Sequence, residues 1–253
     1  MTTKQPIAKK KTPQAFEPFG DPIPHTEPAW YNGFASPYYR QSHVDLRNKI
    51  RKFVDEEILP YQEEWIAKGA YPESLHRRVY ELGISGIIYP KEYGGTPPPD
   101  YDEFHEFVML DELARVGGGG VLGQLSINSM ALPPIMKHGS QYLKDLVLRD
   151  VIQGHKNCCL MISEPTAGSD VVNIKTTARR EGDFYIINGE KKWITGGHMA
   201  HFFTALVRTG GEGPGGLSVV VIPRDTPGIT IRKMATQFDS CHGTTFVILD
   251  DVK

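Results

Sequence analysis

The chain has 253 residues, of which 40% are hydrophobic and 23% are charged, the usual composition of a globular protein with a sizeable core. Its net charge of −2 provides no general field that attracts nucleic acid or an anionic membrane, and no apolar run reaches the roughly 18 to 20 residues that span a bilayer. Three cysteines without C-x-x-C spacing predict neither a zinc site nor a disulfide framework. We therefore expect a reducing compartment, with the cytoplasm as the default and a mitochondrial or peroxisomal location as alternatives.

Residues 1–39 are predicted to form a poorly ordered arm that lies against the body of the protein or awaits a partner. Seven prolines fall within positions 1–37 and four lysines within the first eleven positions, without the apolar stretch of a secretory signal. A mitochondrial transit peptide is rich in arginine, whereas the first arginine here is Arg40. The folded part of the chain is expected to begin at residue 40.

An all-helical domain is predicted for residues 40–155. Apolar residues recur at helical spacing from Val44 to Ile58, with Ser42 as the expected N-cap and Asp45 at the capping-box position. Further helices are expected over residues 72–83, 100–116, 121–137 and 140–153. The third helix is expected to bury an apolar stripe of Phe104, Phe107, Val108, Leu110 and Ala114.

From residue 156 to residue 253 the pattern changes to short strands, which predict an antiparallel β-barrel or sandwich. The expected strands lie in CCLMIS, HFFTALVRT, LSVVVIP, ITIRKM and TTFVILDDV. Asn188-Gly189, between two alternating segments, predicts a type I′ hairpin turn. The GGEGPGG stretch is expected to form a hairpin or loop tip, because strands continue beyond it.

Several enzyme signatures are incomplete in this sequence. GGGVLG at 118–123 satisfies G-x-G-x-x-G, but it follows a charged helix instead of a buried strand. HEFVM at 105–109 lacks the second histidine of a zinc helix, and His198 and His201 have no third ligand nearby. There is no G-x-S-x-G elbow for a serine hydrolase. No metal site and no hydrolase site are predicted.

The stretch SEPTAGSD, residues 163–170, is the strongest candidate for a ligand site. It offers the hydroxyls of Ser163, Thr166 and Ser169 and main-chain amides freed by Gly168, but no lysine follows the glycine as in a phosphate cradle. About 25 residues later, KWITGG ends a strand and carries Trp193. Together the two segments can supply a hydrogen-bonding edge and a flat apolar wall for a planar heterocycle such as a flavin. An ordinary turn and a core tryptophan are the alternative.

The run MISEPTAGSDVVNIKTTARREGDFYIINGEKKWITGG, with YPKEYGG and PPIMKHGSQYLKD before it, resembles the acyl-CoA dehydrogenase family. The likeness covers roughly residues 40–253. It implies an α+β chain in which a helical N-terminal domain (40–155) precedes a β-barrel middle domain (156–253), with FAD between them. The chain is expected to lack the family's C-terminal four-helix bundle, which would follow Lys253, and so to be a truncated member. The residues that the resemblance assigns to the cofactor are Leu160, Met161, Ile162, Ser163, Gly168, Ser169, Trp193, Ile194 and Thr195.

The resemblance also implies individual roles. The Ser163 hydroxyl is expected to donate to flavin N5, the Trp193 indole to lie against the ring, and Ser169 to bind the CoA part of the substrate as well. Glu164 is expected to shape the turn rather than to act chemically. This chain departs from the family at Thr166, where many members have glycine, and in the loop at residues 242–244, where many read Ser-Asp-Thr.

The activity implied is α,β-dehydrogenation of an acyl-CoA thioester to the 2,3-enoyl-CoA, with electrons passed to an acceptor such as an electron-transfer flavoprotein. The catalytic base is expected in the C-terminal bundle, which also builds a homo-oligomer, so no catalytic residue is nominated and this chain alone is expected to be inactive. A related acyl-CoA oxidase or flavin monooxygenase, or a non-catalytic remnant or interaction module of the same fold, remain alternatives. Candidates for the wall of the acyl pocket are Leu122, Leu125, Ile127 and Met130.

Overall fold

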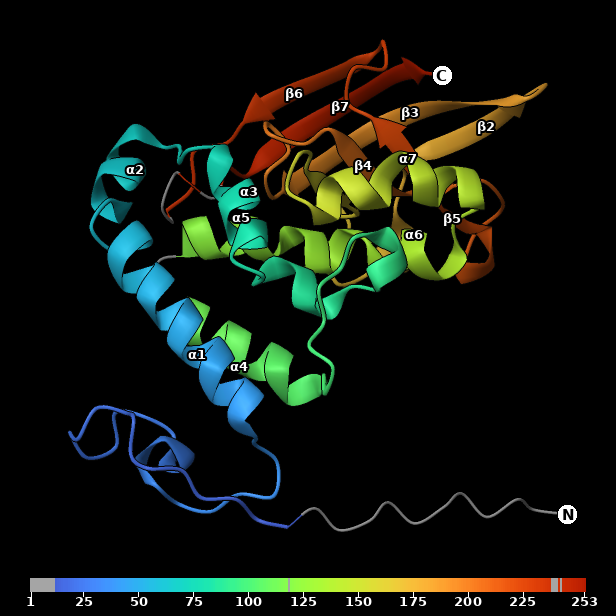
Figure 1. The fold of residues 1–253 in the computed structure, drawn as a ribbon. Coiled ribbons are helices and arrows are strands. Elements are labelled where there is room, and N and C mark those ends of the chain that lie inside the picture. Colours follow the sequence, from blue (N-terminus) through green and yellow to red (C-terminus); the bar gives the residue numbers. More distant parts are fainter. Residues whose placement is uncertain (1–11, 118, 238–240, 242) are drawn as a thin grey trace, which may run out of the picture.

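A helical domain lies beside a curled seven-stranded sheet in the computed structural model, which describes residues 12–117, 119–237, 241 and 243–253 (Figure 1). The helices are α1 (Gln41–Phe53), continued by a π-helical stretch at Val54–Ile58, α2 (Gln62–Lys68), α3 (Ser74–Glu81), α4 (Glu103–Ala114), α5 (Gly119–Ala131), α6 (Pro133–His138) and α7 (Gln141–Ile152). Secondary structure changes from helix to strand between Ile152 and Cys158. Within the described ranges no helix combines the length and the apolar character needed to cross a bilayer.

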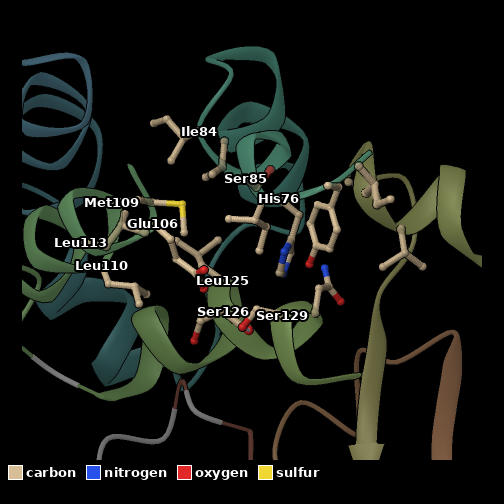
Figure 2. A pocket seen from close by; sticks show the side chains of 17 residues that line it. His76, Ile84, Ser85, Glu106, Met109, Leu110, Leu113, Leu125, Ser126 and Ser129 are labelled. Carbon is tan, nitrogen blue, oxygen red and sulfur yellow. Dashed lines mark hydrogen bonds between the residues drawn. The ribbon is translucent and has the colours of Figure 1, made fainter. Parts of the chain in front are cut away.

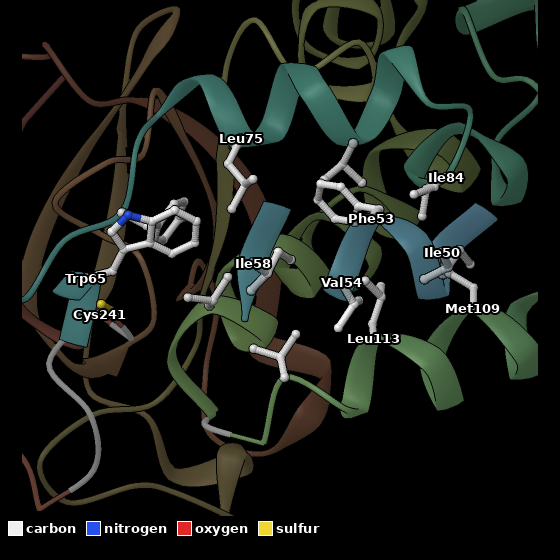
Figure 3. Packing of buried hydrophobic residues seen from close by; sticks show 14 of the residues in the cluster. Ile50, Phe53, Val54, Ile58, Trp65, Leu75, Ile84, Met109, Leu113 and Cys241 are labelled. Carbon is white, nitrogen blue, oxygen red and sulfur yellow. The ribbon is translucent and has the colours of Figure 1, made fainter. Parts of the chain in front are cut away.

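The core of the helical domain forms where α1 packs against its neighbours (Figure 3). Ile50, Phe53 and Val54 recur at helical spacing, so they lie on one face of α1 and its π-helical continuation and are almost completely buried. They meet side chains of α4, including Met109 and Leu113. The periodic apolar pattern of the sequence therefore corresponds to the buried face of this helix.

Two helix N-termini lie side by side, and the predicted N-cap Ser42 is wrong. Helix α1 begins after Arg40, whose main-chain N–H donates to Nδ1 of His43 at 2.9 Å. Helix α4 repeats the arrangement: the N–H of Asp102 donates to Nδ1 of His105 at 3.1 Å. A histidine three residues into each helix therefore satisfies the N-cap amide, a task that a Glu or Gln side chain usually performs.

The two helices are also joined to each other by His43, Asp102, His105 and Ser42. Since both Nδ1 atoms accept main-chain protons, both Nε2 atoms carry the hydrogen. His43 Nε2 donates to Asp102 at 2.9 Å, and His105 Nε2 donates to the Ser42 hydroxyl at 3.1 Å. His43, Asp102 and His105 have the spacing of a metal ligand set, with donor atoms within 4.8 Å of one another. Because each ring nitrogen already has a hydrogen-bond partner, the cluster is explained by its role in connecting the N-termini of the two helices.

The apolar stripe predicted for α4 is only partly correct: Val108 is buried, but other members are not. Phe107 and Leu110 are 56% and 41% exposed, whereas His105 and Glu112 are completely buried. Glu112 can be buried because Arg51 donates to both of its carboxylate oxygens at 2.8 Å. A paired polar residue therefore occupies a position on the inner face that hydrophobicity alone assigned to solvent.

Residues 12–39 pack against α1 and α4, so this part of the predicted arm lies against the body of the protein; residues 1–11 lie outside the described ranges. The segment lies at the end of the two helices that is remote from the sheet (Figure 1). Trp30 and Tyr31 are buried against Val44 and Val108, and the Trp30 ring stacks on Tyr39 with centroids 4.0 Å apart. Burial of the aromatic side chains of residues 12–39 offsets the conformational entropy that is lost when this segment becomes ordered.

An ion-pair network fastens the same segment to the helices. Glu27 accepts from Arg47 with both carboxylate oxygens at 3.2 Å and also contacts Arg51. The Tyr31 hydroxyl donates to Glu112 at 3.1 Å. Two arginines from α1 are thus balanced by one carboxylate from residues 12–39 and one from α4.

The sheet is mixed and open in the described part of the chain, so the predicted antiparallel barrel is only partly correct. Its strands are β1 (Cys158–Met161), β2 (Thr177–Glu181), β3 (Phe184–Ile194), β4 (Phe202–Arg208), β5 (Leu217–Pro223), β6 (Ile229–Lys233) and β7 (Thr245–Val252). Their order is β1-β4-β2-β3-β7-β6. Strands β1 and β2 pair with the two ends of the same side of β4, and β5 pairs with its opposite side. Both β1 and β2 pair with β4 in parallel, while the remaining pairs are antiparallel. Consecutive strands predict antiparallel pairing, but here β4 returns beside β1 after the β2–β3 hairpin.

The predicted hairpin at Asn188-Gly189 is wrong, because both residues lie inside β3. The turn falls instead at residues 182–183, and β2 pairs with β3 from Glu181 opposite Phe184. Gly189 is required by a close approach: a Cβ atom there would lie 2.5 Å from Oγ1 of Thr176. The GGEGPGG loop does connect an antiparallel hairpin, β4 to β5, as predicted.

Candidate functional site

The end of β1 and the end of β3 lie side by side, which brings Ser163 and Trp193 to one place. Beyond Met161 the chain continues along β3, and the main-chain N–H of Lys192 donates to the carbonyl oxygen of Ser163 at 2.9 Å. Ser163 therefore lies beside the residue that precedes Trp193. The two segments, which the sequence separates by about 25 residues, therefore meet where β1 and β3 end. We call this place the Ser163–Trp193 edge.

Trp193 occupies a strained position that turns its side chain outward. The β3–β7 register shifts between Lys192 and Ile194, and Trp193 has a φ of 66°. A left-handed φ is unfavourable for a bulky residue and is often found at functional sites, and a bulge redirects the side chain that it contains. The indole is 54% exposed and packs under the Lys192 ammonium, 4.6 Å from the ring centroid. A core role for this tryptophan is thereby excluded.

The turn after Ser163 is closed by its own main chain. The N–H of Glu164 donates to the carbonyl of Ala167 at 2.9 Å, and the N–H of Ala167 donates back at 3.3 Å. Thr166, Gly168 and Ser169 are exposed on this turn. A Cβ at Gly168 would meet nothing within 4 Å, and the side chain of Thr166 occupies solvent, so the departure from glycine at position 166 is accommodated.

The other residues assigned to the cofactor differ in what they can offer. Met161 and Ile194 are buried in the core of the sheet domain, so only their main-chain groups can reach a ligand. Leu160 packs toward the helices, while Ile162 and Thr195 are half-buried. His242 lies outside the described residues; in the same loop, Gly243 accepts from the Gly196 N–H at 3.2 Å, next to the W-I-T element.

A buried ion pair beneath this edge was not predicted. Lys191 has no exposed surface, and its ammonium donates to Glu164 at 3.0 Å, to the Ile162 carbonyl at 2.9 Å and to the Leu206 carbonyl at 2.6 Å. Glu164 also accepts from the main-chain N–H groups of Lys175 (2.5 Å) and Thr176 (2.9 Å). The sequence does carry a signal, since the charged Lys191 stands at an inward position of a strand whose other inward residues are apolar.

The ionisation of this pair follows from its contacts. Burial alone raises the pKa of the Glu164 carboxyl, but the hydrogen bonds from Thr176, Lys175 and Lys191 bring it below its ordinary value. Burial lowers the pKa of Lys191, and its contact with Glu164 opposes that change. Glu164 is therefore an ionised carboxylate with its oxygens occupied, which disfavours a role as catalytic base.

A separate cavity of about 40 Å³ lies inside the helical domain, large enough for ordered water (Figure 2). Its wall is mostly apolar, with Met109, Leu110 and Leu113 from α4 and Leu125 from α5. Polar groups line it as well: Ser126, Ser129, His76 and Glu106. Among the residues proposed for an acyl pocket, Leu125 lines this cavity, Leu122 packs in the helical core, Ile127 packs in the sheet core, and Met130 is exposed.

The helical domain and the curled sheet agree with one family of proteins. The description "Acyl-CoA dehydrogenase, N-terminal domain" matches residues 40–155, and "Acyl-CoA dehydrogenase, middle domain" matches residues 159–252. The chain belongs to the acyl-CoA dehydrogenase family, whose members are FAD-dependent oxidoreductases.

Individual relatives show how far the likeness extends. Acyl-CoA dehydrogenase AFT10-1 of Alternaria alternata is 36% identical over 247 residues, which are 93% of this chain and 57% of that protein. The crystal structure of an acyl-CoA dehydrogenase from Geobacillus kaustophilus superposes with a TM-score of 0.78 at 32% identity, over 85% of this chain and 57% of that one. A glutaryl-CoA dehydrogenase from Mycobacterium smegmatis, in complex with FADH2, gives a TM-score of 0.76 at 28% identity and covers 85% and 54%. The chain thus spans little more than half the length of these relatives.

Proposed function

We propose that the chain provides the flavin-binding edge and part of the acyl-CoA site of an acyl-CoA dehydrogenase, which converts an acyl-CoA thioester to the 2,3-enoyl-CoA. The observation that carries the proposal is the meeting of Ser163 with Trp193 at the end of β1 and β3. The 36% identity to an acyl-CoA dehydrogenase over 93% of the chain supports it.

The residues at this edge fit an isoalloxazine. A flavin needs a flat apolar surface and hydrogen-bond donors for its ring heteroatoms. The half-exposed indole of Trp193 offers the surface, and the half-buried Ser163 with the main chain of the 164–170 turn offers the donors. When bound, FAD would supply the acceptor for the hydride that leaves the β-carbon of the thioester. The protein's part at this edge is to orient the ring and to hold a hydroxyl proton at Ser163 Oγ.

The substrate is proposed to lie along the same edge. Ser169 is exposed at the tip of the turn and is available to the CoA part, whose phosphates and amides are strong hydrogen-bonding groups. The acyl part is proposed to follow α5, whose residue Leu125 lines the cavity of the helical domain. At about 40 Å³ that cavity holds water but not an acyl chain, so the acyl part is proposed to lie along α5 outside it.

No catalytic base is assigned among these residues. Glu164 is committed to Lys191 and to two main-chain amides, and it lies beneath the turn instead of facing solvent. An electron acceptor such as an electron-transfer flavoprotein, and assembly into a homo-oligomer, remain proposals for the whole protein.

Competition between flavin fragments tests the proposal. The chain is titrated with FAD while flavin fluorescence is followed, and riboflavin or ADP is then added as competitor. Because the proposed edge contacts the ring, we expect saturable binding that riboflavin displaces and ADP does not. Displacement by ADP alone, or binding that never saturates, would contradict the assignment of this edge to the flavin ring.

A further inference from the structure

Four segments of the candidate site meet at a single pair of buried charges. Glu164 belongs to the turn that follows Ser163, and Lys191 lies two residues before Trp193. The carboxylate holds the start of β2 through the N–H groups of Lys175 and Thr176. The ammonium donates to the carbonyl oxygen of Ile162 and to that of Leu206, which belongs to β4.

The peptide that Lys191 holds is the one that leads into Ser163. All three N–H groups of the Lys191 ammonium donate hydrogen bonds, so any other position of the ammonium would lose at least one of these bonds. One residue further along β3, the main chain of Lys192 holds the carbonyl of Ser163. Ser163 is therefore fixed from both sides by consecutive residues of the strand that carries Trp193.

Stability alone does not explain a buried lysine here. Removing an ammonium and a carboxylate from water has a large unfavourable free energy, and apolar residues of similar volume often stabilise a fold equally well. Around this pair the inward positions of the sheet, such as Ile187, Ile194 and Val247, are filled by apolar side chains. Lys191 departs from them next to the Ser163–Trp193 edge.

We propose that Lys191 and Glu164 are positioning residues for the flavin edge, which keep Ser163 and Trp193 in register by fixing the turn, β2 and β3 to one another. This inference rests on the proposed flavin function and deepens it. Neither residue touches the ligand; each acts through the main chain of its neighbours. The pair sets where the Ser163 hydroxyl and the Trp193 indole lie relative to each other.

The test compares Lys191→Met and Glu164→Gln with Ile222→Ala, a substitution in the same sheet core that removes only apolar volume and lies on β5, which pairs with β4 and not with the strand of Lys191. Hydrogen exchange of the peptides covering 160–176 and 190–195 is measured without flavin. The NMR signal of the Trp193 indole N–H is recorded as a second report, assigned by its loss in Trp193→Phe. Riboflavin affinity is measured in parallel.

We expect exchange in these two segments to accelerate on the order of a hundredfold in Lys191→Met and Glu164→Gln, because one buried charge is left unpaired. The indole signal should shift and riboflavin affinity should fall at least about tenfold, an effect of the order of one lost charge-assisted hydrogen bond. Ile222→Ala should lower the unfolding midpoint, while exchange in these two segments, the indole signal and the riboflavin affinity stay near their wild-type values.

Unchanged exchange and an unchanged indole signal in both charge variants would overturn the inference. It would equally be overturned if Ile222→Ala, at a similar loss of unfolding midpoint, reproduced the same changes, since the pair would then be a stability element only. If the wild-type chain binds no riboflavin, the proposed function fails, while exchange and the indole signal still decide whether the pair positions the edge.

Discussion

The main-chain N–H of Lys192 donates a 2.9 Å hydrogen bond to the carbonyl oxygen of Ser163, and this bond joins the two segments of the candidate site. The bond continues the contact of β1 with β3 beyond the last residue of β1. The next residue, Trp193, leaves the regular ladder at a bulge. A hydrogen-bonding turn and an outward-facing aromatic ring therefore share one edge.

Replacement of Trp193 by Ala should weaken flavin binding. An aromatic contact contributes about 0.5–1.5 kcal/mol beyond area burial, so we expect affinity to fall by roughly two- to tenfold. Phe184 provides the matched control, because it is a 52% exposed aromatic residue at the other end of β3. Fluorescence titration with riboflavin measures both variants. An equal effect of Phe184→Ala and Trp193→Ala would contradict the placement of the ring.

Replacement of Trp193 by Gly should separate stability from binding. The φ of 66° is strained for a bulky residue and unstrained for glycine, and such strain is worth about 1–3 kcal/mol. Because the indole is already 54% exposed, little burial is lost. We expect the free energy of unfolding of Trp193→Gly to exceed that of Trp193→Ala, while both variants bind flavin poorly. Urea denaturation measures the difference; a glycine variant less stable than the alanine variant would show that the bulge carries no strain.

Replacement of Glu112 by Ala should destabilise the helical domain strongly. Its carboxylate is buried and receives Arg51, Arg47 and Tyr31, so the change leaves buried arginine donors without their acceptor. Breaking a buried pair in this way lowers the free energy of unfolding by about 3 kcal/mol or more. Glu56→Ala is the control, since Glu56 pairs with Lys52 at 4.0 Å on the surface and its loss should change the value by less than about 1 kcal/mol. Similar losses in both would refute the role of the network.

How much of this molecule follows from sequence depends on how local the cause is. The strands β4 to β7 and the helices α1 and α7 were predicted near their observed positions, because alternation and helical spacing are local signals. The predicted stripe of α4 is only partly correct because Glu112 is buried by Arg51, which lies 61 positions earlier in the chain. No local pattern contains that pairing.

The same limit applies to the sheet and the site. Asn188-Gly189 has the composition of a turn, yet the glycine is required by its close approach to Thr176, the residue before β2. The parallel pairing of β1 with β4 arises from the path of the intervening hairpin. Ser163 and Trp193 were identified by their motifs, whereas the Glu164–Lys191 pair beneath them depends on a contact between positions 27 apart.

Substitution of Gly189 by Ala tests the close approach in β3. The added Cβ would lie 2.7 Å from Cα of Thr176, so main chain must shift, and we expect a loss of about 1–3 kcal/mol in the free energy of unfolding. Gly168→Ala is the paired control, because a Cβ there meets nothing within 4 Å. Its effect should stay below about 1 kcal/mol. If Gly189→Ala were as mild as Gly168→Ala, β3 would not pass so close to Thr176.

Stability should fall on acidification through His76. Burial lowers the pKa of His76 from 6.5 to about 4, so the folded state keeps it neutral while the unfolded state takes up a proton. The contribution of neutral His76 to the free energy of unfolding is fully present above pH 6.5. It is lost between pH 6.5 and about 4, and the total loss is roughly 3 kcal/mol. Denaturation curves of wild type and His76→Gln at several pH values measure it, with His138→Gln as an exposed control. A wild-type minus His76→Gln difference that does not change with pH would contradict this assignment.

A crystal structure of the chain with FAD bound tests the central claim most directly. The account predicts the isoalloxazine against the Trp193 indole, with the Ser163 hydroxyl within about 3.2 Å of a ring heteroatom. A flavin ring bound elsewhere on the molecule, with both residues facing solvent, would contradict it.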